Sequence, residues 1–404
     1  MKKHKDLDKY LQFQRKKYFI KSFFRKAKRL IVDFVPLQNI PNEYCEEKIV
    51  VRTEQTSIVE TPKTFIAPSL EIIIQLNPVI IYGLKNVFVA SETTSFLTKN
   101  LKTTYYEEVE KFSKEYTLMY NSNNLLFHSE KLAKLNNLPK KYVDREVLFL
   151  TGNFSFNYFH FLIEILTKIE FVQSIPNFEN LLVVVHHKIG EIGNMKSLLS
   201  FFVPNNEILF LSEDFYYQFR KTWHISYPSV VIPNIGEGDF CKAEFSKISQ
   251  QSVSFVRNTC LSNMDTKQVK IEPISKIFLA RKTEFRKYNE PELLAVAEKF
   301  GFQPVYLEDY TIHEQIYLMQ HSEYIVGPSG AAWTNLIFCQ PGKTKGLLWL
   351  ANVWKEFSLF STLANYSGVD LYNWRFGDDS LGFHEDYVLD TSEFEQQLIQ
   401  LLAK

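Results

Sequence analysis

Regular alternation of strand-like and helix-like segments in the last third of the chain limits the possible folds more than any other feature. From residue 274 onward, short apolar runs such as "KIFLARK", "EYIVG" and "GLLWLAN" are separated by segments of helical periodicity. Strands joined by helices pair in parallel, and helices then cover both faces of the sheet. We therefore expect an α/β fold with a doubly wound sheet, in which a ligand binds beyond the carboxyl ends of the strands.

Helix boundaries in this region are also predictable. Pro291 occupies the first turn of one helix, and Gly301 follows its last turn. Thr311 and Glu314 have the T-x-x-E spacing of a capping box, which predicts the start of a second helix. A third helix, "AAWTNLIFC", follows the loop "GPSG".

The middle of the chain shows the same alternation less regularly. "EVLFL" precedes a helical segment at about 157–173, and "LLVVVHH" and "EILFL" follow it. The earlier runs "LEIIIQL" and "VFVA" resemble the first strands of the same domain. Because the stretch at 228–250 is loop-like, we expect two Rossmann-like, doubly wound domains at 36–240 and 241–385. Residues 386–404 are expected to form a C-terminal helix that can pack back across the domains.

The N-terminal segment is strongly basic although the formal net charge of the chain is zero. Residues 1–29 contain twelve lysines and arginines against Asp6 and Asp8. Apolar residues at helical spacing between these basic residues predict an amphipathic helix within an extension at 1–35. Such a helix can lie on an anionic membrane surface or pack on the protein's own domain, and both interpretations stay open. The apolar positions are Ile20, Phe23, Phe24, Ala27, Leu30, Ile31 and Phe34.

Several classes of protein are not indicated by the sequence. No apolar run approaches the roughly 18 residues of a membrane span, and no secretory signal is recognisable. We therefore expect a cytoplasmic protein, peripheral on the inner face of the cytoplasmic membrane if the basic helix binds there. Neither a metal, a cofactor nor a nucleic-acid partner is expected, and the cysteines lack metal-ligand spacing. These cysteines are Cys45, Cys241, Cys260 and Cys339.

Two loops of the last third are candidate anion sites. "GPSGAAWTN" brings Gly327, Ser329 and Gly330 to the opening of a helix, where unpaired N–H groups favour an anion such as a diphosphate. "LARKTEFRKYNE" brings Arg281 and Arg286 to the same sheet edge, and guanidinium groups suit bidentate phosphate contacts. The alternatives are a glycine loop that serves only tight packing and a basic loop that is only solvated.

Candidate residues for catalysis lie in the middle of the chain. His160 and Glu164 are four residues apart on one helix face and are therefore neighbours. The histidine can act as general base for an acceptor hydroxyl, oriented by the carboxylate, or the carboxylate can act itself. Alternatively, this face, which also carries Asn157 and Lys168, is only solvated. His186 and His187 end a strand, so at most one of these two adjacent side chains faces a cleft.

Four segments in this order resemble glycosyltransferase family 61. "NYFHFLIEIL" is similar to the family's N-Y-x-H-[WF]-L-x-[DE] segment, and "ARKTEFRKYNEPEL" is similar to its R-[RK]-x-x-x-R-x-x-N-E loop. "GFQPVYLEDYTIHEQIYLM" and "YIVGPSGAAWTNLIFCQPG" complete the resemblance, which covers about residues 150–350. Ser329 stands where eukaryotic members usually have histidine and Trp333 where leucine is common, so no donor sugar follows from the resemblance.

The resemblance implies a glycosyltransferase B type fold with two Rossmann-like domains facing a cleft. It further implies an inverting, metal-independent transfer of a sugar from a nucleotide-sugar donor to an oligo- or polysaccharide acceptor, such as a bacterial capsular or other surface glycan. His160 and Glu164 become the leading base candidates, with Asn157 and His187 as acceptor contacts. The donor-binding candidates are Arg281, Arg286, Glu308, Glu314, Gly327, Ser329, Gly330 and Asn335.

Two other functions are compatible with the sequence. One is a different transferase on the same fold, such as a pyruvyl transferase that modifies the glycan. The other is a non-catalytic scaffold that binds a nucleotide sugar or glycan within a capsule assembly complex. The activated donor that is consumed would separate the first alternative, and binding without turnover would indicate the second.

Overall fold

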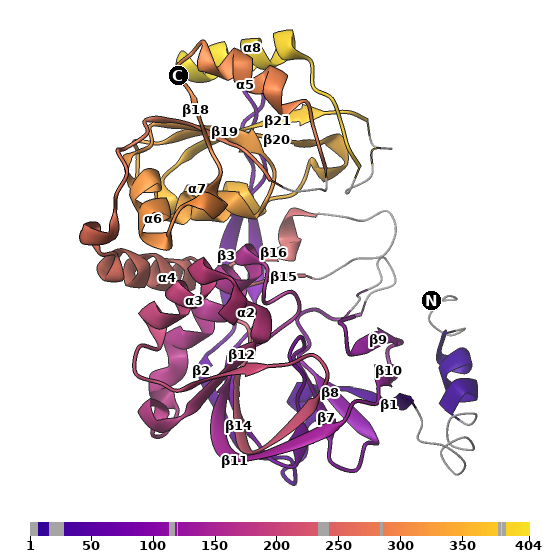
Figure 1. Cartoon of the computed structure of the whole chain (residues 1–404). Helices are drawn as coiled ribbons and strands as arrows, with labels where there is room; N and C mark the ends of the chain where they lie inside the picture. Colours follow the sequence, from indigo (N-terminus) through magenta and orange to yellow (C-terminus); the bar gives the residue numbers. More distant parts are fainter. Residues whose placement is uncertain are drawn as a thin grey trace. The chain divides into compact units, whose positions relative to one another are not determined.

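The structure, a computed structural model, describes residues 7–15, 28–112, 118, 120–232, 242–282, 286–378, 381 and 385–404. It confirms the expected mixed α/β class. The chain forms two compact units (Figure 1). Unit 1 comprises Met1–Gln55 and Leu76–Asp239, and unit 2 comprises Thr56–Gln75 and Phe240–Lys404.

Unit 2 contains a parallel five-stranded sheet in the order β18-β17-β19-β20-β21. Counted along the chain from β17, this order is 2-1-3-4-5, and it reverses direction between β17 and β19. Connections at such a reversal leave on opposite faces of the sheet and open a crevice beyond the carboxyl ends of the strands. The strands are β17 (Lys276–Leu279), β18 (Gln303–Val305), β19 (Tyr324–Pro328), β20 (Lys345–Ala351) and β21 (Asp370–Phe376).

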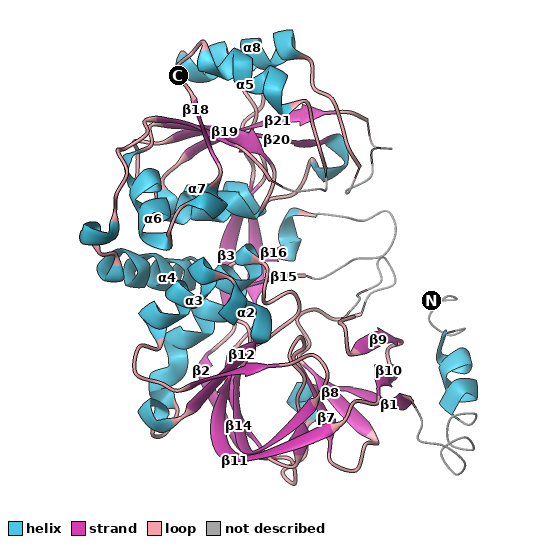
Figure 2. Ribbon diagram, in the orientation of Figure 1, coloured by secondary structure: helices cyan, strands magenta, loops and turns pink. Residues whose placement is uncertain are grey.

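Helices cover both faces of this sheet, as Figure 2 shows. On one face α5 (Glu290–Glu298) packs on α8 (Thr391–Leu402), the helix expected at the C-terminus, and α8 also packs on β20. On the other face the 3-10 helix Ala331–Phe338 contacts three α-helices. They are α4 (Gln250–Asn263), α6 (Ile312–His321) and α7 (Leu359–Ser367).

The predicted capping box is present at the start of α6. The Thr311 hydroxyl accepts the N–H of Glu314, and the Glu314 carboxylate accepts the N–H of Thr311 at 2.9 Å. The predicted end of α5 is also confirmed, since Gly301 follows the helix with a φ of 84°, a left-handed value that glycine adopts without strain.

Unit 1 contains two mixed six-stranded sheets, ordered β13-β12-β11-β14-β5-β2 and β6-β7-β8-β1-β10-β9. In the first sheet, β11, β12, β13 and β14 run parallel to one another. β5 runs antiparallel to both of its neighbours, β14 and β2. Besides these parallel strands, unit 1 therefore contains antiparallel strands and a second sheet that the prediction for 36–240 did not include. The strands of the first sheet are β2 (Cys45–Arg52), β5 (Val79–Leu84), β11 (Lys140–Phe149), β12 (Leu182–His186), β13 (Ile208–Leu211) and β14 (Tyr216–Ile225). Those of the second are β1 (Arg29–Pro36), β6 (Val87–Phe88), β7 (Ser95–Thr98), β8 (Thr103–Tyr106), β9 (Leu125–His128) and β10 (Leu132–Asn136).

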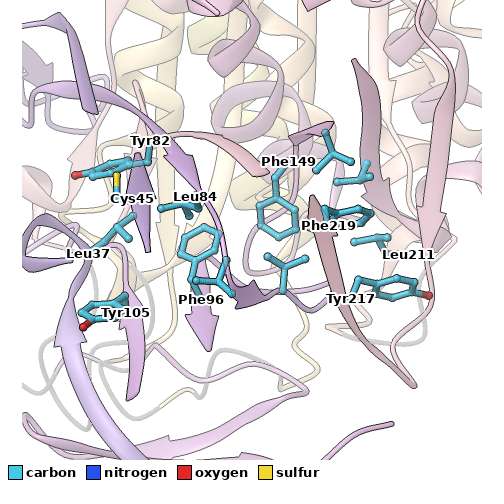
Figure 3. Close-up of a cluster of buried hydrophobic side chains, with 14 of the residues drawn as sticks. Leu37, Cys45, Tyr82, Leu84, Phe96, Tyr105, Phe149, Leu211, Tyr217 and Phe219 are labelled. Carbon is cyan, nitrogen blue, oxygen red and sulfur yellow. The ribbon is translucent and has the colours of Figure 1, made fainter. Parts of the chain in front are cut away.

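The core of unit 1 lies between these two sheets (Figure 3). Phe96 and Tyr105 come from the second sheet, and Phe149 and Phe219 come from the first. The ring centroids of Phe96 and Phe149 are 5.8 Å apart in an edge-on arrangement, which is favourable for aromatic pairs. This packing fixes the sheet whose carboxyl ends carry the candidate base.

The two early strands predicted at "VFVA" and "LEIIIQL" are both present, but they lie in different units. "VFVA" contains β6, but "LEIIIQL" contains β4 (Glu71–Leu76), which pairs with β3 (Gln55–Glu60) in a hairpin that belongs mainly to unit 2. In that unit the ring of Phe65 stacks on Tyr372 at 4.4 Å between centroids, and the N–H of Asn373 donates to Lys63 O at 2.7 Å. The loop between β3 and β4 therefore packs on β21, the edge strand of the five-stranded sheet.

The amphipathic helix predicted between Ile20 and Phe34 is wrong for its last residues, because Arg29–Pro36 forms β1. Long-range pairing of β1 with β8 and β10 satisfies its backbone and overrides the helical spacing. Residues 20–27 of the predicted helix lie outside the described residues. Residues 7–15 are helical, and Leu11 is buried against Ile31 and Leu132.

Within the described parts of the chain, no helix is both long and apolar enough to cross a membrane. Cys45, Cys260 and Cys339 are buried free thiols, and Cys241 lies outside the described residues.

Replacement of Thr311 by alanine tests the capping box. We expect Thr311→Ala to lower the free energy of unfolding by about 1 kcal/mol, because the N-cap hydroxyl is lost. Urea denaturation followed by circular dichroism measures this change. Thr266→Ala, at an exposed position of the same unit, is the control and should stay within about 0.5 kcal/mol of the wild type. Equal effects of the two substitutions would contradict the role of the cap.

Candidate functional site

Loops after the parallel strands of unit 1 gather polar side chains at one edge of the sheet. β11 leads through residues 150–157 into a π-helix, His160–Ile165, that continues as the 3-10 helix Leu166–Ser174. β12 leads into α2 (His187–Glu191), which precedes α3 (Gly193–Phe202), and β14 leads to Tyr227. Parallel pairing places all these connections at the carboxyl edge of the sheet, where ligands bind in such folds. π-Helical turns are frequent at functional sites, so the π-helix His160–Ile165 also points to this edge.

His160 and Glu164 form the predicted pair. Nδ1 of His160 lies 2.7 Å from Oε2 of Glu164, and the other carboxylate oxygen accepts the N–H of Val231 at 2.8 Å. The His160 side chain is 25% exposed, whereas that of Glu164 is 4% exposed. Because Glu164 and Lys168 are buried, the alternative that this helix face is only solvated is wrong.

A group of fully buried charges lies behind this pair. Nζ of Lys168 lies 3.9 Å from the ring centroid of Tyr227 and has no hydrogen-bond partner among the described residues. Burial lowers the pKa of Lys168 to about 8, although the carboxylates of Glu107 and Glu164 act in the opposite direction. Glu107 accepts hydrogen bonds from Nε2 of His224, at 2.9 Å, and from the N–H of Tyr227.

Sequence reasoning missed Glu107 and His224. Glu107 follows β8 of the second sheet and His224 lies in β14, so no local spacing connects them to Lys168. Despite its burial, which opposes ionisation, the pKa of Glu107 is lowered by Lys168 and by its hydrogen bonds. Burial and then the Lys168 cation lower the pKa of His224, so this histidine is neutral and donates through Nε2.

Tyr227 connects the buried charges to the loop before His160. A Cβ atom at Gly152 would lie 2.0 Å from the Tyr227 hydroxyl, so this position requires glycine. The hydroxyl also bonds to the backbone of Asn153. Phe154, two residues after Gly152, has a left-handed φ of 56°, and its ring centroid lies 5.6 Å from that of His160.

Of the acceptor candidates, Asn157 lies just before the π-helix and its side chain accepts the N–H of Phe159 at 3.0 Å. His187 begins α2, where its ring stacks on that of His186 at 4.6 Å between centroids. Both therefore lie in connections at the edge that carries His160. Glu92, which sequence reasoning missed, is buried in the same unit, and burial followed by the charge of Glu213 raises its pKa to about 7.

His186, His187 and Glu213 have side chains of the types that bind metals, with possible ligand atoms within 4.8 Å of one another. However, Nδ1 of His186 accepts the N–H of Lys188, so Nε2 carries the proton in the neutral ring and offers no lone pair to an ion. Nζ of Lys188 also lies 3.1 Å from Oε1 of Glu213 and balances its charge. These contacts do not fit a metal centre.

In unit 2 two arginines lie where the strand order reverses. Arg281 follows β17, and its Nη2 donates to Ser329 O, just after β19, at 2.6 Å. Its Nη1 is buried without a hydrogen-bond partner in the described part of the chain. Burial and then the Arg281 cation lower the pKa of Arg286 to about 10, and Arg286 also has a left-handed φ of 54°. Two crowded cations with an unsatisfied donor suit an anion.

Glu290 orients this basic edge and was missed as a site residue. Its carboxylate accepts the N–H of Arg281 at 3.1 Å and the hydroxyls of Tyr288 and Tyr306 at 2.6 and 2.8 Å. Because these bonds fix the backbone of Arg281, the guanidinium is directed toward Ser329.

The remaining donor candidates divide into two groups. Gly330 opens the 3-10 helix beside Arg281, and Glu308 accepts the N–H of Lys282 at 3.3 Å. The other three make contacts within the fold. At Gly327 a Cβ atom would lie 2.7 Å from Leu279. The Glu314 carboxylate caps α6 and accepts the N–H of Lys270. The Asn335 side chain donates to Ala332 O.

Comparison with known families gives one match. Residues 158–346 match the sequence model of the family described as Glycosyltransferase 61. The matched region includes the His160–Glu164 pair and the edge that carries Arg281 and Ser329, and Glu107 lies outside it. A search of curated proteins finds no match. Residues 158–346 are therefore a glycosyltransferase family 61 domain, and the protein is a glycosyltransferase.

The buried Lys168 predicts a pH dependence of stability. An unfolded lysine has a pKa near 10.5 and the folded value is about 8, so between these values the unfolded chain binds more protons and stability rises with pH. Relative to Lys168→Met, the wild type should gain about 3 kcal/mol in free energy of unfolding from pH 8 to pH 10.5. Urea denaturation across this range measures the difference, and a constant difference would contradict the burial of the charge.

Proposed function

We propose that this family 61 glycosyltransferase moves a sugar, with inversion at the anomeric carbon, from a nucleotide-sugar donor to a hydroxyl of a bacterial capsular or other surface polysaccharide. In this proposal unit 2 binds the donor and unit 1 binds the acceptor. The two units then act as the two domains of a glycosyltransferase B type enzyme, and no metal ion takes part.

The arrangement of Arg281 and Arg286 at the strand-order reversal is the observation that carries the donor site. Ligands of open α/β sheets bind at this point of the fold, and the unsatisfied Nη1 of Arg281 offers a donor to a phosphate oxygen. The 3-10 helix that opens at Gly330 adds unpaired N–H groups beside the guanidinium. A nucleoside diphosphate supplies the negative charges that offset the repulsion between the two cations.

The proposed base is Nε2 of His160. In the pair the Nδ1–H group donates to Glu164, which fixes the tautomer with a lone pair on Nε2. As the acceptor oxygen bonds to the anomeric carbon, its proton passes to Nε2 and the bond to the diphosphate breaks. Glu164 then stabilises the imidazolium, while the arginines stabilise the leaving diphosphate.

The same charges support the proposed metal independence. The two arginines neutralise phosphate charge in the place where other transferases use a divalent cation. The acceptor roles of Asn157 and His187 rest on their place at the carboxyl edge that carries His160. The polysaccharide class of the acceptor rests on the resemblance to the family, and recruitment by the basic N-terminal segment to an anionic membrane surface stays a prediction.

A panel of nucleotide sugars tests the donor site. In the presence of EDTA, one of the UDP-, GDP- or dTDP-linked sugars should raise the melting temperature and yield an inverted product, identified by proton NMR of the anomeric position. Arg281→Gln and Arg286→Gln should each weaken donor binding at least tenfold, which corresponds to about 1.4 kcal/mol. Arg145→Gln, an exposed surface position of unit 1, should bind normally. Absence of binding by every donor would overturn the proposal.

Substitutions at the base test the chemistry separately from binding. His160→Gln and Glu164→Gln should lower kcat by about 100-fold or more, because a positioned general base contributes about this factor. The donor Kd should stay within about threefold, since neither group contacts the nucleotide in this mechanism. Steady-state kinetics and calorimetry measure the two quantities. Wild-type turnover in both variants would remove the pair from the mechanism.

A further inference from the structure

The proposed base adjoins a buried group of charges that the chemistry described above does not use. Lys168 and His224 are fully buried, and the Glu107 side chain is 7% exposed. Charges in such surroundings are costly unless they compensate one another. The Lys168 cation acts on Glu107 and on the neutral His224, and it also faces Glu164.

Counting charges shows what this group does to the base. With His160 neutral, Glu107 and Glu164 carry two negative charges against the single positive charge of Lys168. Uptake of a proton by His160 brings the whole group to neutrality. Charges interact strongly where water is excluded, so removal of the lysine charge favours proton uptake by the pair, and removal of the Glu107 charge disfavours it.

We propose that Lys168 and Glu107 are positioning residues that set the proton affinity of the His160–Glu164 pair, so that the pair is unprotonated before the reaction and accepts the acceptor proton during it. This inference rests on the proposed function. Lys168 acts through Glu164, four residues away on the same helical segment, and Glu107 acts through Lys168. Neither residue touches the substrate in this proposal.

Three elements supply the ionisable groups around the lysine. The helical segment supplies Glu164, the turn after β8 supplies Glu107, and β14 supplies the neutral His224. The Tyr227 ring covers the ammonium group, and its hydroxyl is bound to Asn153 in the loop before His160. Glu164 is faced by His160, by Lys168 and by the N–H of Val231.

Two substitutions that remove opposite charges test the proposal. In Lys168→Met the acid limb of the kcat/KM profile should move to higher pH by about one unit, because the pair keeps its proton longer. In Glu107→Gln the limb should move to lower pH. Damage to packing alone would lower activity in both variants without moving the two limbs in opposite directions. Lys221→Met is the matched control, because Lys221 also lies over an aromatic ring, that of Trp223, but pairs with Glu47.

A second measurement does not depend on turnover. Histidine NMR, with His160→Gln to assign the signals, gives the pH midpoint of the His160 ring, which should rise in Lys168→Met and fall in Glu107→Gln. If the wild type transfers no sugar, the proposed function fails and these midpoints still decide the inference. Midpoints and limbs that equal those of the wild type and of Lys221→Met would overturn it.

Discussion

Parallel pairing of strands is the constraint on which both units depend. A parallel pair cannot be closed by a tight turn, so each connection crosses over the sheet and every strand delivers its next residues to the same edge. β11 and β14 thereby bring the helix of His160 and the ring of Tyr227 to one edge of unit 1. β17 and β19 bring Arg281 and Ser329 together in unit 2, although 48 residues separate them.

The two candidate sites differ in how charge is stabilised. Around Lys168, opposite charges are enclosed together and solvent is excluded, and a proton on His160 brings the group to neutrality without a ligand. At Arg281 and Arg286, like charges are held side by side at the opening of a helix, and that balance requires a ligand. This contrast agrees with a base that must keep a defined proton affinity and a donor site that must attract an anion.

The sequence predicted unit 2 well because its signals are local. Thr311, Glu314 and Gly301 act within one turn of the helices that they begin or end, and these elements were correct. The strand at "LEIIIQL" was correct, but its place in unit 2 and the strand at residues 29–36 depend on partners distant in sequence and were not predicted. Helical spacing alone could not show that β1 is held between β8 and β10, or that β4 belongs to a hairpin of unit 2.

The candidate sites were predictable for a similar reason and to a similar extent. The pairing of His160 with Glu164 follows from helical spacing, and the position of Arg281 follows from the end of a strand. The burial of Lys168 and the presence of Glu107 do not, because Glu107 comes from the second sheet and approaches only after both sheets pack. The roles of the individual donor and acceptor residues stay predictions, and only ligand binding can assign them.

The hairpin formed by β3 and β4 has a consequence for how the chain matures. Lys63 bonds to Asn373, a partner 310 residues further along the chain. The ribosome must therefore synthesise nearly the whole protein before the loop between β3 and β4 can pack on β21. Until then Phe65 lacks the ring of Tyr372 and stays an apolar surface on a nascent chain, where chaperones can bind it. A gene fragment that begins at residue 240 would encode β21 without the hairpin that packs on it.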